Sequence, residues 1–130
     1  MRWQRENLGL KAASELRREL GDFLTEQCEP DEEAHLSAQV IIGELLSNVA
    51  RHAPGRLSVE IEWEDRRPVL VLNDAGPGFA RDVKLPPLTA ETGRGLYIVA
   101  ALAPRFKTDR LESGGMRYTV DLPMIRKRSD

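Results

Sequence analysis

The sequence predicts an α+β fold in which one β-sheet is covered on one face by helices. Two observations lead to this prediction. Apolar residues recur at helical spacing before Pro54, and the period changes to strand-like alternation from Leu57 onward. Helices that come first and strands that come later are typical of an α+β sandwich, and 130 residues are enough for one compact domain.

The first two elements are expected to be helices. Residues 9–27 carry apolar side chains at helical spacing, namely Ala13, Leu16, Leu20, Phe23 and Leu24. Pro30 and the acids after it favour a second helix start, because proline suits the first helical turn and carboxylates interact well with the helix dipole. This helix should run to about Ala53 and stop at Pro54-Gly55.

Strands should follow. Residues 57–64 alternate between apolar and polar side chains, which predicts a strand with one face in water. Residues 69–72 are all apolar and predict a more central strand, after a turn at Asp65-Arg66-Arg67. No period survives between residues 75 and 92. The remaining elements expected are a short helix over residues 96–102 and a hairpin of residues 106–111 and 116–122, joined across Ser113-Gly114-Gly115.

The composition is that of an ordinary soluble globular protein, with 41% hydrophobic and 31% charged residues. A formal net charge of −2 gives no support for a general attraction to nucleic acid or membranes. The single cysteine, Cys28, excludes an internal disulfide and a cysteine-based zinc cluster and suits a reducing compartment. No apolar stretch reaches the roughly 18 residues of a spanning helix. No secretory signal opens the chain, so we expect a cytoplasmic location.

Glu44, Asn48 and His52 are spaced four residues apart on the second predicted helix, so they should form one polar stripe. An Asn carbonyl is a ligand that Mg²⁺ accepts together with phosphate and water oxygens. A carboxylate near such a metal could orient or deprotonate an attacking hydroxyl. The alternative is a solvated helix face, where Glu and Asn are common. For His52 the alternative is a helix-end residue that interacts favourably with the dipole.

Asp74 directly follows the apolar strand, so its carboxylate is expected at the sheet edge, over a cavity. A buried carboxylate can accept a hydrogen bond from an exocyclic amine such as that of adenine. Gly76 and Gly78 would let the backbone approach a base closely, because glycine has no Cβ. The alternative is an ordinary Asp-Gly turn.

Gly93-Arg94-Gly95-Leu96 precedes the predicted short helix, and exposed amides at a helix N-terminus bind phosphate. Arg94 would add a charge-assisted donor at the same place. The segment before this motif contains Pro86-Pro87, Thr89 and Thr92 and is long enough to act as a lid over the phosphates. The alternative is a plain loop-to-helix hinge.

These three motifs, in this order, resemble the N, G1 and G2 boxes of the GHKL ATPase superfamily, which includes gyrase, histidine kinases and the mismatch-repair MutL proteins. The resemblance covers roughly residues 10–123. It implies ATP and Mg²⁺ as cofactors and the two-layer Bergerat fold, with a mixed sheet and about three helices. It also implies that Glu44 is the catalytic base, that Asn48 binds Mg²⁺ and that Asp74 binds adenine. The other nucleotide-binding residues implied are His52, Gly76, Gly78, Thr92, Gly93, Arg94, Gly95 and Leu96.

Within the superfamily the sequence is most similar to the bacterial anti-sigma-factor serine kinases. His52 four residues after Asn48, and Tyr97-Ile98-Val99 after the second glycine motif, favour that group. The resemblance implies a serine/threonine kinase that phosphorylates a small antagonist protein, binds a sigma factor and acts as a homodimer through the first-helix region. A non-catalytic, nucleotide-gated binding module and a stand-alone histidine-kinase catalytic domain are the alternatives.

Two positions depart from the pattern of these relatives. Met116 stands where many of them have a threonine near the adenine-binding Asp, and Thr119 lies three residues later. Val49 stands where they often have alanine.

Residues around Ala13 to Phe23 could serve a dimer interface, although use in the core is expected. Arg126-Lys127-Arg128 is expected in a solvated, mobile tail from about residue 124.

Overall fold

The computed structural model describes residues 1–52, 55–74 and 91–128, and of His52 and residues 91–94 it describes the backbone alone. The elements in chain order are β1 (Arg2–Arg5), α1 (Leu10–Gln27), α2 (Glu32–His52), β2 (Leu57–Glu64), β3 (Arg67–Asp74), α3 (Glu91–Leu102), β4 (Arg105–Arg110) and β5 (Met116–Asp121). No helix in the described part of the chain is long and apolar enough to cross a membrane.

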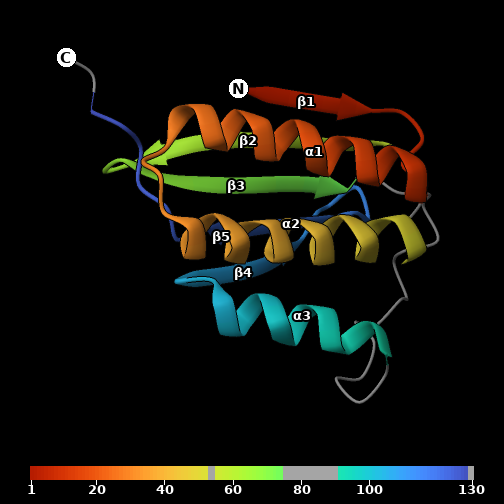
Figure 1. The fold of residues 1–130 in the computed structure, drawn as a ribbon. Helices are drawn as coiled ribbons and strands as arrows, with labels where there is room; N and C mark the ends of the chain where they lie inside the picture. Colours follow the sequence, from red (N-terminus) through yellow and green to blue (C-terminus); the bar gives the residue numbers. More distant parts are fainter. Residues whose placement is uncertain (53–54, 75–90, 129–130) are drawn as a thin grey trace.

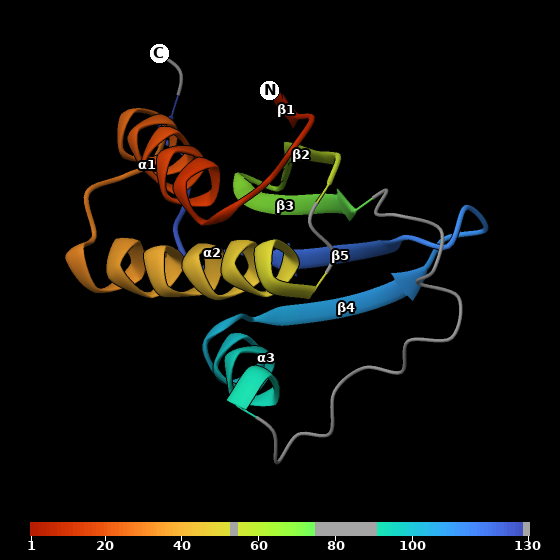
Figure 2. The same cartoon turned by 90° about the vertical axis from the view of Figure 1, so that its right-hand side faces the viewer.

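The strands form one sheet in the order β1-β2-β3-β5-β4. The helices lie side by side, with α2 between α1 and α3 (Figure 1). Figure 2 shows all three on the same face of the sheet. The predicted fold class is therefore confirmed: the chain is an α+β two-layer sandwich, consistent with the Bergerat fold.

One detail of that prediction needs correction, because every strand pair in the described residues is antiparallel, whereas a mixed sheet was expected. β3 and β4 do run in the same direction and are joined through α3, the kind of connection that parallel neighbours require. However, β5 lies between them and pairs with both. The hairpin that returns the chain from β4 to β5 thus prevents a parallel pair.

The core lies between the helices and the inner face of the sheet. α1 contributes the apolar positions that its spacing predicted, and Ala13, Leu16, Leu20 and Leu24 are all buried. α2 contributes Ile41, Ile42, Leu45, Leu46 and Val49, and the sheet contributes Leu57, Val59, Ile61, Leu70, Leu72 and Val120. These four positions of α1 are therefore used in the core, as expected, and a dimer through the first-helix region remains a prediction.

The sequence analysis missed β1, which is an edge strand paired with β2 through Arg2 to Arg5. Its side chains alternate, but only Trp3 marks the inner face, so four residues carry too weak a pattern to predict a strand. The Trp3 ring packs against Phe23 of α1 in an edge-to-face arrangement, with ring centroids 5.4 Å apart. This contact attaches the N-terminal strand to the helical layer.

The two hairpins lie where the turn signals placed them. Between β2 and β3, Asp65 and Arg66 both have positive φ angles, 50° and 68°, which suit the tight turn of a two-residue hairpin. Arg67, expected in that turn, is the first residue of β3. Between β4 and β5, Gly114 has a φ of 96°, a conformation that favours glycine.

The segment after β5 differs from the expected tail. Met124 is buried in the core, and Arg126 forms an isolated β-bridge with Cys28. The Arg126 guanidinium lies 4.5 Å from the centroid of the Trp63 ring, a distance at which a cation–π interaction forms. Residues 122–126 therefore pack on the domain through apolar, backbone and cationic contacts, which the basic run at residues 126–128 does not reveal.

Candidate functional site

α2 carries the first two candidate site residues, Glu44 and Asn48, one helical turn apart. α2 lies between the two other helices and over the sheet, so its inner side chains face β-strands (Figures 1 and 2). Asn48 is only 4% exposed, whereas Glu44 is half-buried. Asn48 therefore does not belong to a solvated helix face, which was the alternative explanation for these polar residues.

Asp74 is the last residue of β3 and is 3% exposed. Asp74 was expected where the apolar strand ends, and it lies there. β3 is a central strand, and Asp74 has Leu57 of β2 on one side and Met116 of β5 on the other. Asp74 thus lies at the end of an interior strand, and burying a carboxylate there is costly unless it serves a partner or a ligand.

Tyr118 of β5 connects these two residues. It lies opposite Leu72 in the β3–β5 register and is 4% exposed. Its hydroxyl accepts a hydrogen bond from Asn48 Nδ2 over 3.4 Å. Burial raises the pKa of the Tyr118 phenol above its ordinary value of 10.0, and the nearby Asp74 charge raises it further, while the bond from Asn48 partly offsets both.

The Asn48 carboxamide is satisfied on one side only. Its nitrogen donates to Tyr118, but Oδ1 is buried and has no hydrogen-bond partner among the described residues. A buried acceptor without a partner costs about 1–3 kcal/mol, so native structures rarely keep one without a reason. A hard cation such as Mg²⁺ takes oxygen ligands of this kind, and the donor therefore fits that ion.

Acidic and metal-binding side chains do not form a cluster of three that could hold a metal ion in the parts of the chain that the structure describes. Proteins usually bind Mg²⁺ through one or two side chains together with substrate phosphates and water, and Asn48 Oδ1 offers one such oxygen.

Gly95 brings α3 against the same region. A Cβ at this glycine would lie 2.6 Å from Glu44 Oε2, closer than real Cβ contacts, so the absence of a side chain is what leaves room for the Glu44 carboxylate. Leu96 follows and is buried. The fold thus brings the glycine motif to the α2 residues, although the two lie far apart in the sequence.

The start of α3 also requires a correction. We expected Gly93 to Leu96 to precede the helix, but α3 begins at Glu91, so this motif occupies its first two turns. The two glycines suggested a loop, because glycine weakens a helix interior. Gly95 nevertheless lies inside the helix, where the absence of a Cβ leaves room for the Glu44 carboxylate. Because α3 begins at Glu91, its first turn includes the Gly93 amide. Amides of a first helical turn have no partner within the helix and can bind an anion.

Other predicted site residues are not placed. Gly76 and Gly78, with the expected lid and its Thr89, lie outside the described residues. For His52, Thr92 and Arg94 the structure gives the helical backbone and no side chain. Their roles therefore remain predictions.

The geometry answers the question raised by Met116 and Thr119. Met116 is the β5 neighbour of Asp74, so the position beside the carboxylate lacks a hydroxyl. Thr119 pairs with Val71 and lines a shallow depression on the outer face of the sheet, away from the helices. Tyr118, one residue earlier, lies on the inner face because side chains alternate along a strand.

Sequence reasoning missed Tyr118 as a site residue. Its strand was predicted, but the register that places its hydroxyl beside Asn48 depends on the pairing of β5 with β3 and on the packing of α2. The available signal was the period of two: Met116, Tyr118 and Val120 must share a face. Because Val120 is apolar, the face of this strand that carries Tyr118 could be predicted to be the one that faces the core.

The fold and the arrangement of these polar residues define a nucleotide-binding domain of the Bergerat type. The family model described as "Histidine kinase-like ATPase domain" matches residues 8–121. The chain therefore belongs to the histidine kinase-like ATPase domain family, whose members bind ATP. No curated protein matches the chain.

Proposed function

We propose that this protein is a serine/threonine kinase of the anti-sigma-factor type, which uses ATP with Mg²⁺ to phosphorylate a small antagonist protein and binds a sigma factor. Membership of the ATPase family supports the nucleotide part of the proposal. The observation that carries it is the buried Asn48, whose Oδ1 has no partner among the described residues. Asn48 follows Glu44 by one helical turn of α2, and Gly95 of α3 leaves room for the Glu44 carboxylate.

The proposal gives each residue a binding role. Asp74 accepts a hydrogen bond from the exocyclic amine of adenine, and Gly76 and Gly78 let the backbone approach the base. The first-turn amides of α3, together with Arg94, hold the phosphates. Asn48 Oδ1 holds Mg²⁺, which supplies neutralisation of the phosphate charge when it is bound.

Glu44 acts as the general base. It takes the proton of the substrate serine hydroxyl as the serine oxygen bonds to the γ-phosphorus. The bond from that phosphorus to the β–γ bridging oxygen breaks, and ADP leaves with the electron pair. A half-buried carboxylate suits this role, because it is held by its surroundings and still accessible to a substrate side chain.

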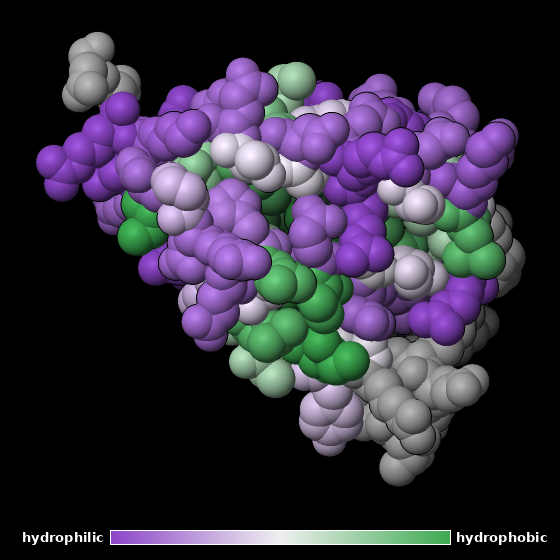
Figure 3. All heavy atoms as spheres, in the orientation of Figure 1, coloured by the Kyte–Doolittle hydropathy of each residue, from purple (hydrophilic) through white to green (hydrophobic). Residues whose placement is uncertain are grey.

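An apolar area on the helical face supports a protein partner. Figure 3 shows hydrophobic surface over α2 and α3. The exposed large apolar side chains of these two helices include Leu36 of α2 and Ile98 and Leu102 of α3, which are 60%, 38% and 38% exposed. Exposed apolar surface of this kind often marks a protein-binding site.

We place the kinase in the cytoplasm, where ATP is abundant and the free Cys28 thiol stays reduced.

The test uses the purified protein, γ-labelled ATP with Mg²⁺ and a cell extract of the source organism. We expect one small protein to become labelled, and the label to be stable to acid and released by alkali, as phosphoserine is. Glu44→Gln should bind ATP as the wild type does and should lose at least about 100-fold in labelling rate, which is the usual contribution of a general base.

Two results would contradict the proposal. Acid-labile label would indicate a phosphohistidine product and a histidine-kinase catalytic domain. ATP binding without any labelling above that of Glu44→Gln would indicate a nucleotide-gated binding module.

A further inference from the structure

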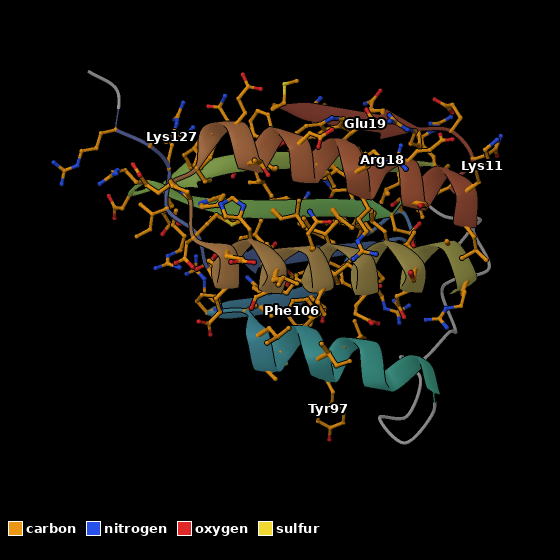
Figure 4. The ribbon with its side chains drawn as sticks, viewed as in Figure 1. Lys11, Arg18, Glu19, Tyr97, Phe106 and Lys127 are labelled. Carbon is orange, nitrogen blue, oxygen red and sulfur yellow. The ribbon has the colours of Figure 1, made fainter. Side chains whose placement is uncertain are left out.

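Tyr118 is one of two tyrosines in the chain, and their environments are opposite. Tyr97 of α3 is 55% exposed and points away from the helical layer (Figure 4). Tyr118 is 4% exposed, and its hydroxyl interacts with the buried Asn48 carboxamide and with the charge of the buried Asp74 carboxylate. A buried hydroxyl that interacts with two polar residues of one site has a role beyond packing, because phenylalanine would fill the same volume.

The hydroxyl can discriminate between the two ends of the Asn48 carboxamide. A phenol has a single proton to donate and also accepts hydrogen bonds. The nearby negative charge of Asp74 favours the protonated phenol and, by electrostatics, a proton directed toward the carboxylate. The phenol oxygen is then left as an acceptor, and it receives the Asn48 Nδ2 proton over 3.4 Å.

The preference of the phenol oxygen for Nδ2 also fixes the direction of Asn48 Oδ1. With Nδ2 turned toward Tyr118, Oδ1 is the end that stays without a partner among the described residues. If the carboxamide were rotated by half a turn, its NH₂ group would face the cation. The partly positive amide hydrogens would repel the cation, and no oxygen would be offered as a ligand. The orientation of one side chain therefore decides whether Asn48 can serve as a metal ligand at all.

We propose that Tyr118 is a positioning residue that holds the Asn48 carboxamide with Oδ1 directed toward the magnesium–nucleotide complex. This inference rests on the proposed function, because it assumes that Asn48 meets Mg²⁺. It adds a role for a residue on the opposite layer of the sandwich, which acts on the metal site through Asn48 and not as a ligand.

The experiment measures ATP affinity by isothermal titration calorimetry with Mg²⁺ and with EDTA, for wild type, Tyr118→Phe and Tyr97→Phe. The readout is the Mg²⁺ enhancement, defined as the ratio of the two dissociation constants. We expect Tyr118→Phe to reduce this enhancement by about tenfold, the effect of losing roughly one well-placed interaction. Affinity in EDTA should stay within about twofold of wild type. Tyr97→Phe should match the wild type in both conditions.

A double-mutant cycle separates positioning from packing. Asn48→Asp presents two equivalent oxygens and needs no orienting partner, so Tyr118→Phe should have no further effect on the Mg²⁺ enhancement in that background. If Tyr118→Phe caused the same loss in the wild-type and Asn48→Asp backgrounds, Tyr118 would act through packing, and the inference would be overturned.

The outcomes also separate this inference from the proposed function. If the wild type showed no Mg²⁺ enhancement of ATP affinity, the proposed metal site and the proposed function would both be contradicted. A wild type with enhancement that Tyr118→Phe leaves intact would overturn only the role of Tyr118. Thermal unfolding of each variant confirms that it is folded, and Tyr118→Phe removes a single oxygen while keeping the ring.

Discussion

Polar residues buried between α2 and the sheet form the candidate site of this domain. Asn48 and Asp74 are the buried polar or charged residues of the described core, and Tyr118 interacts with both. A core of apolar side chains would be more stable at these positions, since an unpaired buried acceptor costs about 1–3 kcal/mol. Binding a ligand at Asn48 Oδ1 would recover that cost, so the site is built to be completed by a nucleotide.

Tyr118 gives a prediction about pH. Its pKa is raised in the folded state, so the neutral phenol is the form that the fold favours. The resulting stability is fully present below the unfolded-state pKa of about 10 and is lost as pH rises through the higher folded-state pKa. The difference in unfolding free energy between wild type and Tyr118→Phe should therefore shrink as pH rises from about 9 to about 11. Denaturant unfolding at each pH measures it, and a constant difference would contradict the assignment.

At the scale of elements, the contact between α2 and α3 sets the position of the Glu44 carboxylate. Gly95→Ala would place a Cβ 2.6 Å from Glu44 Oε2 and force that flexible end to move. The same change removes a helical glycine, which favours the fold by roughly 0.8–1 kcal/mol. We expect turnover to fall at least about tenfold while the unfolding free energy changes by less than about 1 kcal/mol.

Gly43→Ala is the matched control for that variant. It also removes a helical glycine, but its Cβ would meet the end of the flexible Arg17 side chain at 3.1–3.3 Å. Arg17 can move aside, so Gly43→Ala should raise the unfolding free energy by up to about 1 kcal/mol and leave turnover unchanged. Equal turnover in the two alanine variants would show that Gly95 does not control the Glu44 carboxylate.

The segment after β5 is held by Trp63. Its ring lies under the Arg126 guanidinium and 6.4 Å from the Phe23 ring of α1, so it connects the C-terminal segment to the helical layer. Arg126→Ala should lower the unfolding free energy by about 0.5–1 kcal/mol, the value of an exposed cation–π pair. Thermal or denaturant unfolding measures the loss. Arg128→Ala provides the control, and a loss of the same size there would assign the effect to net charge.

The elements differ in how well the sequence predicted them, for physical reasons. α1, α2 and β2 have long apolar periods and were predicted within one or two residues of their observed bounds. β1 is too short to show a period, and it forms only because the edge of β2 is available. The start of α3 was misplaced because Gly93 and Gly95 oppose a helix locally, and the packing that places Gly95 beside Glu44 is tertiary.

The same reasoning applies to the candidate site. Glu44, Asn48, Asp74 and the glycine motif could be identified from spacing and residue type, because each is a local pattern. Tyr118 could not be identified in this way, because its role depends on the pairing of β5 with β3 and on the packing of α2 over that part of the sheet. Residues whose function comes from an inter-layer contact are the ones that local patterns leave out.

At the scale of the whole molecule, Cys28 reports on the packing of α1 against the C-terminal segment. Burial raises the pKa of its thiol from 9.0 to about 11, and the charges of Arg126 and Lys127 offset part of that rise. The native thiol should therefore react slowly with iodoacetamide at about pH 8 and faster as pH approaches 11. Stability from the neutral thiol is present below pH 9 and is lost between pH 9 and 11.

Cys28→Ala is the control for this prediction, because it should remove that part of the alkaline loss of stability. Rapid alkylation of the folded wild type at about pH 8, at the rate of the unfolded chain, would show that the segment does not cover Cys28.

The central claim is that this domain binds ATP through Asp74 and holds Mg²⁺ through Asn48. Isothermal titration of ATP, with and without Mg²⁺, into wild type, Asp74→Asn and Asn48→Ala tests it most directly. We expect Asp74→Asn to lose at least about 100-fold in affinity under both conditions, and Asn48→Ala to lose mainly the Mg²⁺ enhancement. Absence of ATP binding by the wild type, or full binding by Asp74→Asn, would contradict the account.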